Sequence, residues 1–171
     1  MKQLTHNDIE NKQQQFPITI VCDAIRTPEN IGMCFRISES FGVQKIFFHE
    51  NSPSLENRKV INTARNTINQ IEHELYTDFA TVISKLKAEG NTIIGIEITD
   101  KSINIQDFNF KNYQKIVLLL GSERNGISTI NLVDHTISIP MFGRNSSMNV
   151  IHSLAITLYE VTNQLVKNSL Q

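Results

Sequence analysis

The chain has 171 residues, of which 40% are hydrophobic and 19% are charged, a composition that is typical of a soluble globular protein and excludes a disordered chain. The formal net charge of −1 excludes indiscriminate polyanion binding, which rests on a clear excess of Lys and Arg, so any nucleic-acid site must be local. The longest apolar runs fall far short of the roughly 20 residues of a membrane span, and the N-terminal stretch lacks a hydrophobic signal core, so we expect a cytoplasmic protein without a membrane partner.

Residues 1–15 are rich in Gln and Asn and show no sustained periodicity, so we expect a mobile N-terminal arm there, with a short helix as the alternative. The remaining length suffices for one sizeable hydrophobic core and is too short for two ordinary ones, which predicts a single domain over residues 16–171. Cys22 and Cys34 have neither the number nor the spacing of a disulfide framework or a zinc site. Both have apolar neighbours, and we expect them to be buried thiols.

The first predicted strand, residues 18–24, leads into a helix that is signalled at both ends. Thr27 suits the N-cap and Pro28 suits the first helical position, where a missing N–H does no harm. Gly42 can take the left-handed conformation that ends a helix. The apolar residues spaced four apart predict the buried stripe of this helix, which would consist of Met33, Ile37 and Phe41.

A second strand is predicted over residues 43–49, and basic residues then gather within residues 57–66, namely Arg58, Lys59 and Arg65. This basic segment is either a solvated helix face or a local nucleic-acid contact. Further along, apolar residues recur at i, i+3, i+4 and i+7 from Phe79 to Leu86, which predicts an amphipathic helix that Gly90 ends.

Three more apolar runs predict strands over residues 92–98, 115–121 and 135–141, and a last amphipathic helix follows over roughly residues 148–167. Apolar runs of this kind that alternate with helices predict an α/β fold, with a mainly parallel sheet and helices on both faces. Ligands of such sheets bind at the carboxyl ends of the strands. The loops that follow residues 18–24, 115–121 and 135–141 are therefore the candidates for a site.

The loop GSERNGIS, residues 121–128, follows its predicted strand at once. Gly121 and Gly126 allow the backbone to turn tightly and to approach a ligand closely. The loop matches neither the Walker pattern nor G-x-G-x-x-G, and Glu123 would repel a phosphate while tolerating a cationic ligand. The sequence therefore disfavours a pyrophosphate cofactor, although an acidic turn without a ligand is the other interpretation.

No other catalytic pattern assembles along the chain. It contains no H-E-x-x-H, no G-x-S-x-G and no histidine pair at ligand spacing, so we expect no metal. The polar loop GRNSSMN, residues 143–149, has two interpretations. Ser147 can cap the last helix with Asn149 in its first turn, or both side chains can serve a site, and the two roles are compatible.

Three segments taken together, PENIGMCFRISESFG, LLLGSERNGIS and ISIPMFGRNSSMNVIHSLAITLYE, resemble the SpoU (TrmH-like) ribose methyltransferases of the SPOUT superfamily. Their order and spacing fit the three motifs of that family, and the resemblance runs from about residue 18 to residue 165. It implies a C-terminal deep trefoil knot, which is an exception to the rule that chains avoid knots. It also implies a homodimer with its two active sites at the interface, S-adenosylmethionine as cofactor, and RNA, either tRNA or rRNA, as the substrate.

The resemblance also implies roles for particular residues. The catalytic residues carried over from the three motifs are Asn30, Arg36, Glu123, Ser147 and Asn149. The backbone that lines the cofactor pocket would surround Ile98, Gly121, Ile139 and Met148. The family commonly has a serine and an alanine where this chain has Ile151 and Ser153, which puts only a secondary polar contact in doubt.

The implied reaction is a displacement in which a ribose 2′-oxygen attacks the sulfonium methyl group. A guanidinium is almost never deprotonated, so we expect Arg36 to orient an RNA phosphate and the hydroxyl, while the phosphate or water takes the proton. Two alternatives stay open. One is a non-catalytic RNA-binding protein that keeps the fold, and the other is an unknotted flavodoxin-like nucleotide binder, against which the absent phosphate loop counts.

Overall fold

The computed structural model describes residues 1–4, 8 and 13–169 of the chain. Much of the predicted N-terminal arm, residues 5–7 and 9–12, lies outside the described residues, so its mobility stays a prediction. Within the described part, no helix is long and apolar enough to cross a bilayer. The cytoplasmic location likewise stays a prediction.

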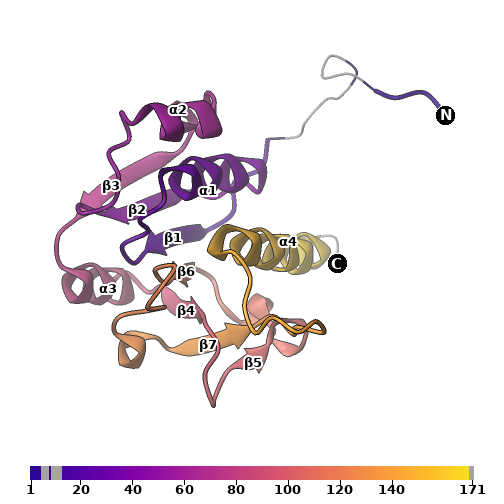
Figure 1. Ribbon diagram of the computed structural model, residues 1–171. Helices are drawn as coiled ribbons and strands as arrows, with labels where there is room; N and C mark the ends of the chain where they lie inside the picture. Colours follow the sequence, from indigo (N-terminus) through magenta and orange to yellow (C-terminus); the bar gives the residue numbers. More distant parts are fainter. Residues whose placement is uncertain (5–7, 9–12, 170–171) are drawn as a thin grey trace.

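A seven-stranded sheet forms the centre of the molecule, with the order β3-β2-β1-β6-β4-β7-β5, and every neighbouring pair is parallel (Figure 1). Five strands confirm the predicted ones, each a little shorter than predicted, namely β1 (Ile18–Cys22), β2 (Lys45–His49), β4 (Thr92–Ile96), β6 (Ile116–Leu120) and β7 (His135–Ser138). The predicted α/β class with a parallel sheet is therefore confirmed, and the knotted path of the C-terminal segment stays a prediction.

Two edge strands were not predicted, β3 (Glu72–Tyr76) and β5 (Ile103–Asn104). Only Tyr76 of β3 is buried, and both residues of β5 are exposed. An edge strand pairs on one side only and needs little apolar surface, so it lacks the apolar run that indicates a buried strand. In β3 the exposed charges also form ion pairs, because Lys45 Nζ lies 2.7 Å from Glu72 and 2.9 Å from Glu74.

Helices cover both faces of the sheet, as predicted (Figure 1). One buried cluster joins Ile20, Leu118 and Ile94 to α1 (Pro28–Ser40), α2 (Arg58–Ala64) and α4 (Val150–Ser169). A second cluster on the opposite face joins the alternate residues Val21, Val117 and Leu119 to α3 (Phe79–Ala88). Because successive strand residues point to opposite faces, β1, β2, β4 and β6 each contribute to both clusters. Short 3-10 turns occupy Thr67–Gln70, Ile105–Asp107, Phe110–Asn112 and Ile130–Leu132.

The packing of α1 corrects one prediction. Its fully buried apolar residues are Ile31, Cys34 and Phe35, whereas the expected stripe of Met33, Ile37 and Phe41 is only half-buried. The helix packs against both α2 and α4, and two apolar stripes compete for the core. The residues predicted at the two ends of α1 are confirmed, since Pro28 lies in its first turn and Gly42 follows its C-terminal end with φ +63°.

Cys22 and Cys34 are free, fully buried thiols, as predicted, and their Sγ atoms lie 3.9 Å apart. Burial, and then the neighbouring thiol of Cys34, raise the pKa of Cys22 well above its ordinary value. The Cys22 thiol is therefore uncharged, and both cysteines are core residues near the carboxyl end of β1.

Candidate functional site

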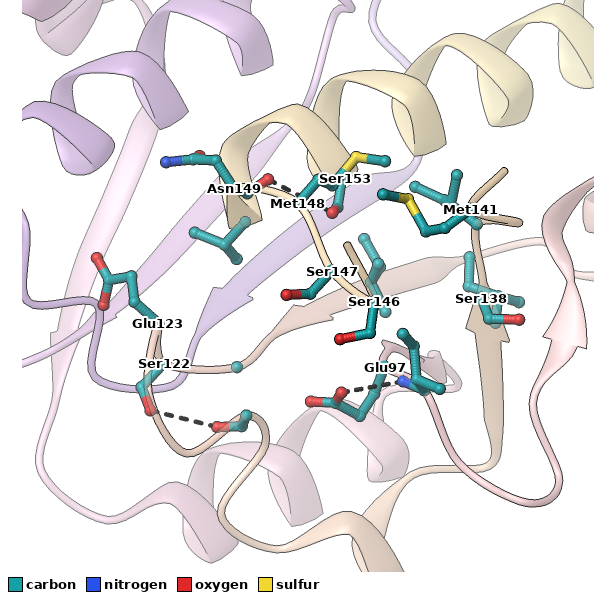
Figure 2. A pocket seen from close by; sticks show the side chains of 17 residues that line it. Glu97, Ser122, Glu123, Ser138, Met141, Ser146, Ser147, Met148, Asn149 and Ser153 are labelled. Atoms are coloured by element: carbon teal, nitrogen blue, oxygen red, sulfur yellow. Dashed lines mark hydrogen bonds between the residues drawn. The ribbon is translucent and has the colours of Figure 1, made fainter. Parts of the chain in front are cut away.

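A cavity of about 280 Å³ lies at the carboxyl ends of β4, β6 and β7 (Figure 2). The loops after these strands line it together with the first turn of α4. The loops after β6 and β7 are two of the three loops predicted for the site, and the loop after β4 was not one of them. Seven of the nine predicted site residues line this cavity, namely Glu123, Ser147, Asn149, Ile98, Gly121, Ile139 and Met148. The loop after β1 enters the site only indirectly, through hydrogen bonds to Glu123.

A chain of hydrogen bonds links three of the predicted catalytic residues. Asn149 donates through Nδ2 to Oδ1 of Asn30 at 3.2 Å, and Asn30 donates through Nδ2 to Oε1 of Glu123 at 2.9 Å. The three residues are far apart in sequence and come from the three predicted motifs. Asn30 is buried, with 7% of its surface exposed, and it lies behind the cavity wall rather than in it. It is therefore placed to position the other two side chains.

The carboxylate of Glu123 lies at the N-terminal end of α1. Its Oε2 accepts the backbone N–H of Arg26 at 3.1 Å, and its Oε1 accepts that of Thr27 at 3.1 Å. Thr27 is the N-cap residue, as predicted, but its side chain makes no capping hydrogen bond, and Glu123 supplies an acceptor at this helix end instead. Partial burial alone raises the pKa of Glu123, but the hydrogen bonds from Arg26 and Asn30 outweigh it and hold the pKa below its ordinary value. Glu123 is therefore ionised at neutral pH.

The loop after β6 is held tightly closed. Ser122 and Gly126 exchange backbone hydrogen bonds at 2.9 and 3.1 Å. A Cβ at Gly121 would lie 2.2 Å from the carbonyl carbon of Gly126, and Gly126 itself has φ +64°. The predicted tight turn is confirmed, and the close approach of this backbone to a ligand stays a prediction.

Glu97, directly after β4, is a cavity residue that the sequence analysis missed. Its carboxylate is half-buried and accepts backbone N–H groups from Ile98 at 2.9 Å and Ile127 at 3.2 Å. A single acidic residue does not form a sequence motif, so no pattern of spacing identifies Glu97 as a site residue. The only signal in the sequence is its place at the carboxyl end of a buried strand.

Asn149, rather than Ser147, caps α4. The helix begins at Val150, two residues later than predicted, and Oδ1 of Asn149 accepts the backbone N–H of Ile151 at 2.8 Å. Ser147 lies before this cap and lines the cavity. The interpretation of Ser147 as a cap is therefore wrong, and Asn149 has two roles, capping through its oxygen and contacting Asn30 through its nitrogen.

These two roles of Asn149 can be separated by substitution. Asn149→Ala is expected to lower the free energy of unfolding by about 1 kcal/mol, because the cap is lost. Asn149→Ser keeps a hydroxyl oxygen that can accept the backbone N–H of Ile151 and places no charge beside Asn30, so it is expected to lose less stability than Asn149→Ala. Urea denaturation of the three proteins measures the difference, and equal losses in both variants would contradict the capping role.

Arg36, like Asn30, is a predicted catalytic residue that does not line the cavity. It is exposed on α1 and does not belong to the cavity lining. Its backbone carbonyl accepts the hydroxyl of Ser40 at 2.9 Å, which is a local contact within the helix. Any action of Arg36 on a ligand of this cavity therefore requires a further component, either a bound substrate or another chain.

The charged residues that line the cavity are Glu97 and Glu123, and no Lys, Arg or His is among the lining residues. Among the described residues, no group of three or more His, Cys, Asp and Glu side chains is arranged to hold a metal ion. The lining thus combines two carboxylates with five serine hydroxyls and apolar side chains such as Ile137, Ile139 and Met148. Such a surface suits a ligand that is partly apolar and partly cationic, and it repels phosphate.

Comparison with known proteins places these features in a family. The model of the SpoU rRNA Methylase family matches residues 17–159. The chain is 23% identical over 154 residues to a tRNA (guanosine(18)-2′-O)-methyltransferase of Escherichia coli, covering 89% of this chain and 66% of the relative. It is 27% identical over 161 residues to a 23S rRNA (guanosine-2′-O-)-methyltransferase of Neisseria meningitidis, covering 93% of this chain and 63% of the relative.

A solved structure shares the fold. The SpoU methyltransferase AviRb of Streptomyces viridochromogenes, in complex with the cofactor AdoMet, superposes with a TM-score of 0.79 at 22% identity, covering 95% of this chain and 65% of that chain. The chain thus spans just under two thirds of the length of these relatives.

Proposed function

The chain belongs to the SpoU rRNA methylase family, and from this premise we propose that it transfers a methyl group from S-adenosylmethionine to a ribose 2′-hydroxyl of tRNA or rRNA. The observation that carries the proposal is the cavity at the carboxyl ends of β4, β6 and β7, which the second and third predicted motifs line. The first motif contributes Asn30, which forms hydrogen bonds with two of the lining residues, Glu123 and Asn149. The names of the E. coli and N. meningitidis relatives support both tRNA and rRNA as substrate classes.

The residues of the cavity fit this cofactor. S-adenosylmethionine carries a sulfonium and an ammonium group, and the lining offers the carboxylates of Glu97 and Glu123 without an opposing cation. The closed loop from Gly121 to Gly126 brings the backbone to the cavity surface, and Ile139 and Met148 supply apolar surface for a base. We propose that the backbone around Ile98, Gly121, Ile139 and Met148 holds the adenosine part.

Bound S-adenosylmethionine supplies an electrophilic methyl group, so the protein has to align the ribose hydroxyl with it and help the hydroxyl to lose its proton. Ser147 and Asn149, just before α4, line the cavity, and we propose that they contact the ribose. Asn30 and Glu123 hold Asn149 in position through the hydrogen-bond chain. Arg36 would bind an RNA phosphate and orient the hydroxyl, while the phosphate or water takes the proton.

Calorimetric titration tests the cofactor. One S-adenosylmethionine per chain is expected to bind equally well with and without excess EDTA, because the described residues hold no ligand set for a cation. ATP and flavin mononucleotide are the control ligands, and we expect the acidic lining to weaken their binding by at least about tenfold. Tight binding of either nucleotide, or S-adenosylmethionine binding that only added zinc or magnesium restores, would contradict the proposal.

We also propose that the protein acts as a homodimer. Ile156 and Tyr159 of α4 are 41% and 63% exposed, and Met33 and Ile37 of α1 are half-buried, so both helices leave apolar surface uncovered in a single chain. A second copy would cover this surface, and it would also bring another Arg36 to the assembly. Light scattering at micromolar concentration is expected to give twice the 19.5 kDa mass of the chain. A monomer alone would contradict the dimer.

A further inference from the structure

Glu97 contributes only its negative charge to the function proposed above, although it lines the same cavity as Glu123. The two carboxylates enter the cavity from separate loops, Glu97 after β4 and Glu123 after β6 (Figure 2). A half-buried carboxylate that faces a cavity has to find partners for its oxygens, since burial penalises unpaired charge. The partners of the two residues differ, and this difference suggests what Glu97 does.

Glu123 has three donors from its own chain, namely the backbone N–H groups of Arg26 and Thr27 and the side-chain amide of Asn30. Glu97 has two, one on each oxygen, from the backbone N–H groups of Ile98 and Ile127. A carboxylate offers about four acceptor sites. Glu97 therefore keeps about one acceptor site free on each oxygen, whereas the capacity of Glu123 is mostly used.

The position of the Glu97 carboxylate is fixed before any ligand binds. The two backbone donors hold it from opposite loops, one after β4 and one after β6. A Cβ at Gly126 would lie 2.3 Å from Oε2 of Glu97, so the carboxylate occupies the space that this glycine leaves. Fixed acceptors of this kind favour a ligand that offers donors at a matching spacing, because little conformational entropy is lost on binding.

An acceptor-only group with a free site on each oxygen matches a pair of neighbouring hydroxyl groups. In dinucleotide-binding α/β folds, an acidic residue accepts a hydrogen bond from a ribose hydroxyl at the carboxyl edge of a parallel sheet, the edge at which Glu97 lies. We propose that Glu97 is a specificity-determining residue that accepts hydrogen bonds from the 2′- and 3′-hydroxyls of the cofactor ribose. This inference rests on the proposed function, since it assigns one part of that cofactor to one side chain.

A merely structural role of Glu97, holding the loop after β6, has to be separated from this one. The test titrates wild type, Glu97→Ala and Glu97→Gln with S-adenosylhomocysteine and with its 2′-deoxy and 3′-deoxy analogues. Wild type is expected to bind each deoxy analogue about tenfold to a hundredfold more weakly, as for a hydrogen bond to a charged group. Glu97→Ala is expected to bind all three ligands within about threefold of one another, because neither hydroxyl then has its acceptor.

The matched control is Asp100→Asn, an exposed carboxylate in the same loop that does not line the cavity. It is expected to discriminate among the three ligands as wild type does. Thermal unfolding of each variant shows whether the fold is kept. If Glu97→Ala does not fold, the affinities of the wild type and of Glu97→Gln for the three ligands test the proposal. Gln keeps one acceptor oxygen, so the difference in affinity between S-adenosylhomocysteine and its deoxy analogues is expected to be smaller for Glu97→Gln than for the wild type.

Three results would overturn the assignment to the ribose. The first is equal affinity of the wild type for S-adenosylhomocysteine and its deoxy analogues. The second is a Glu97→Ala variant that still binds S-adenosylhomocysteine more tightly than the deoxy analogues. The third is Glu97→Ala that loses affinity for S-adenosylhomocysteine and none for 5′-methylthioadenosine, which would assign Glu97 to the ammonium group. All three leave the proposed function standing, whereas wild type that does not bind S-adenosylhomocysteine at all overturns both.

Discussion

Arg36→Ala is expected to slow single-turnover methyl transfer about a hundredfold to a thousandfold, the usual effect of removing one well-placed electrostatic group. The affinity for S-adenosylmethionine should stay within a few fold of wild type, because Arg36 does not line the cavity. The physical reason is that its guanidinium would act on the RNA side, where it binds a phosphate and fixes the attacking hydroxyl. Rapid-quench transfer to RNA, beside calorimetric titration of the cofactor, measures both quantities.

The control for this variant is Arg58→Ala, an exposed arginine at the start of α2. It removes the same charge and is expected to leave the rate at saturating RNA within about threefold of wild type, even where RNA affinity falls. A near wild-type rate in Arg36→Ala would show that Arg36 is an ordinary surface residue, and the role carried over from the first motif would then be wrong.

Gly121→Ala is expected to abolish cofactor binding and to lower the free energy of unfolding by about 1–3 kcal/mol, as overpacking a closed site does. The added Cβ would lie 2.2 Å from the carbonyl carbon of Gly126, which is backbone and cannot rotate away. The loop would have to open, and it would carry Glu123 and the Ile127 donor of Glu97 with it. Urea denaturation and calorimetric titration measure the two effects.

Gly143→Ala is the matched control for stability, since a Cβ there meets no atom within 4 Å. It is expected to change the free energy of unfolding by no more than about 0.5 kcal/mol. Equal stability of the two variants would contradict the account of the loop after β6, because it would mean that the loop accommodates a side chain at Gly121.

The fold could be predicted where burial imposes a pattern. β1 and β6 are buried along their whole length and are almost entirely apolar, so both strands and the parallel sheet could be predicted from the sequence. The buried face of α1 could not be predicted in the same way. Its sequence carries two apolar stripes, and the packing of α2 and α4 on either side selects the one with Ile31 and Phe35.

The residues that line the cavity could largely be predicted from the sequence, whereas the hydrogen bonds between them could not. Glu123 and Asn149 were expected near one another because both follow strands that end at one edge of the sheet. The hydrogen bonds that join them through Asn30 depend on side-chain geometry that no spacing rule contains. Glu97 was missed for a related reason, since its partners are backbone N–H groups of loops that only the fold brings together.

The central claim is methyl transfer to a ribose 2′-hydroxyl, and one measurement tests it most directly. Purified protein is incubated with tritium-labelled S-adenosylmethionine and total RNA from cells that lack its gene, and the RNA is then digested to nucleosides. The label is expected in a 2′-O-methylnucleoside from tRNA or rRNA, and mapping would place it at a site that is unmodified in the gene-deficient cells. Cofactor binding without any label in RNA, or label on a base instead of a ribose, would contradict the claim.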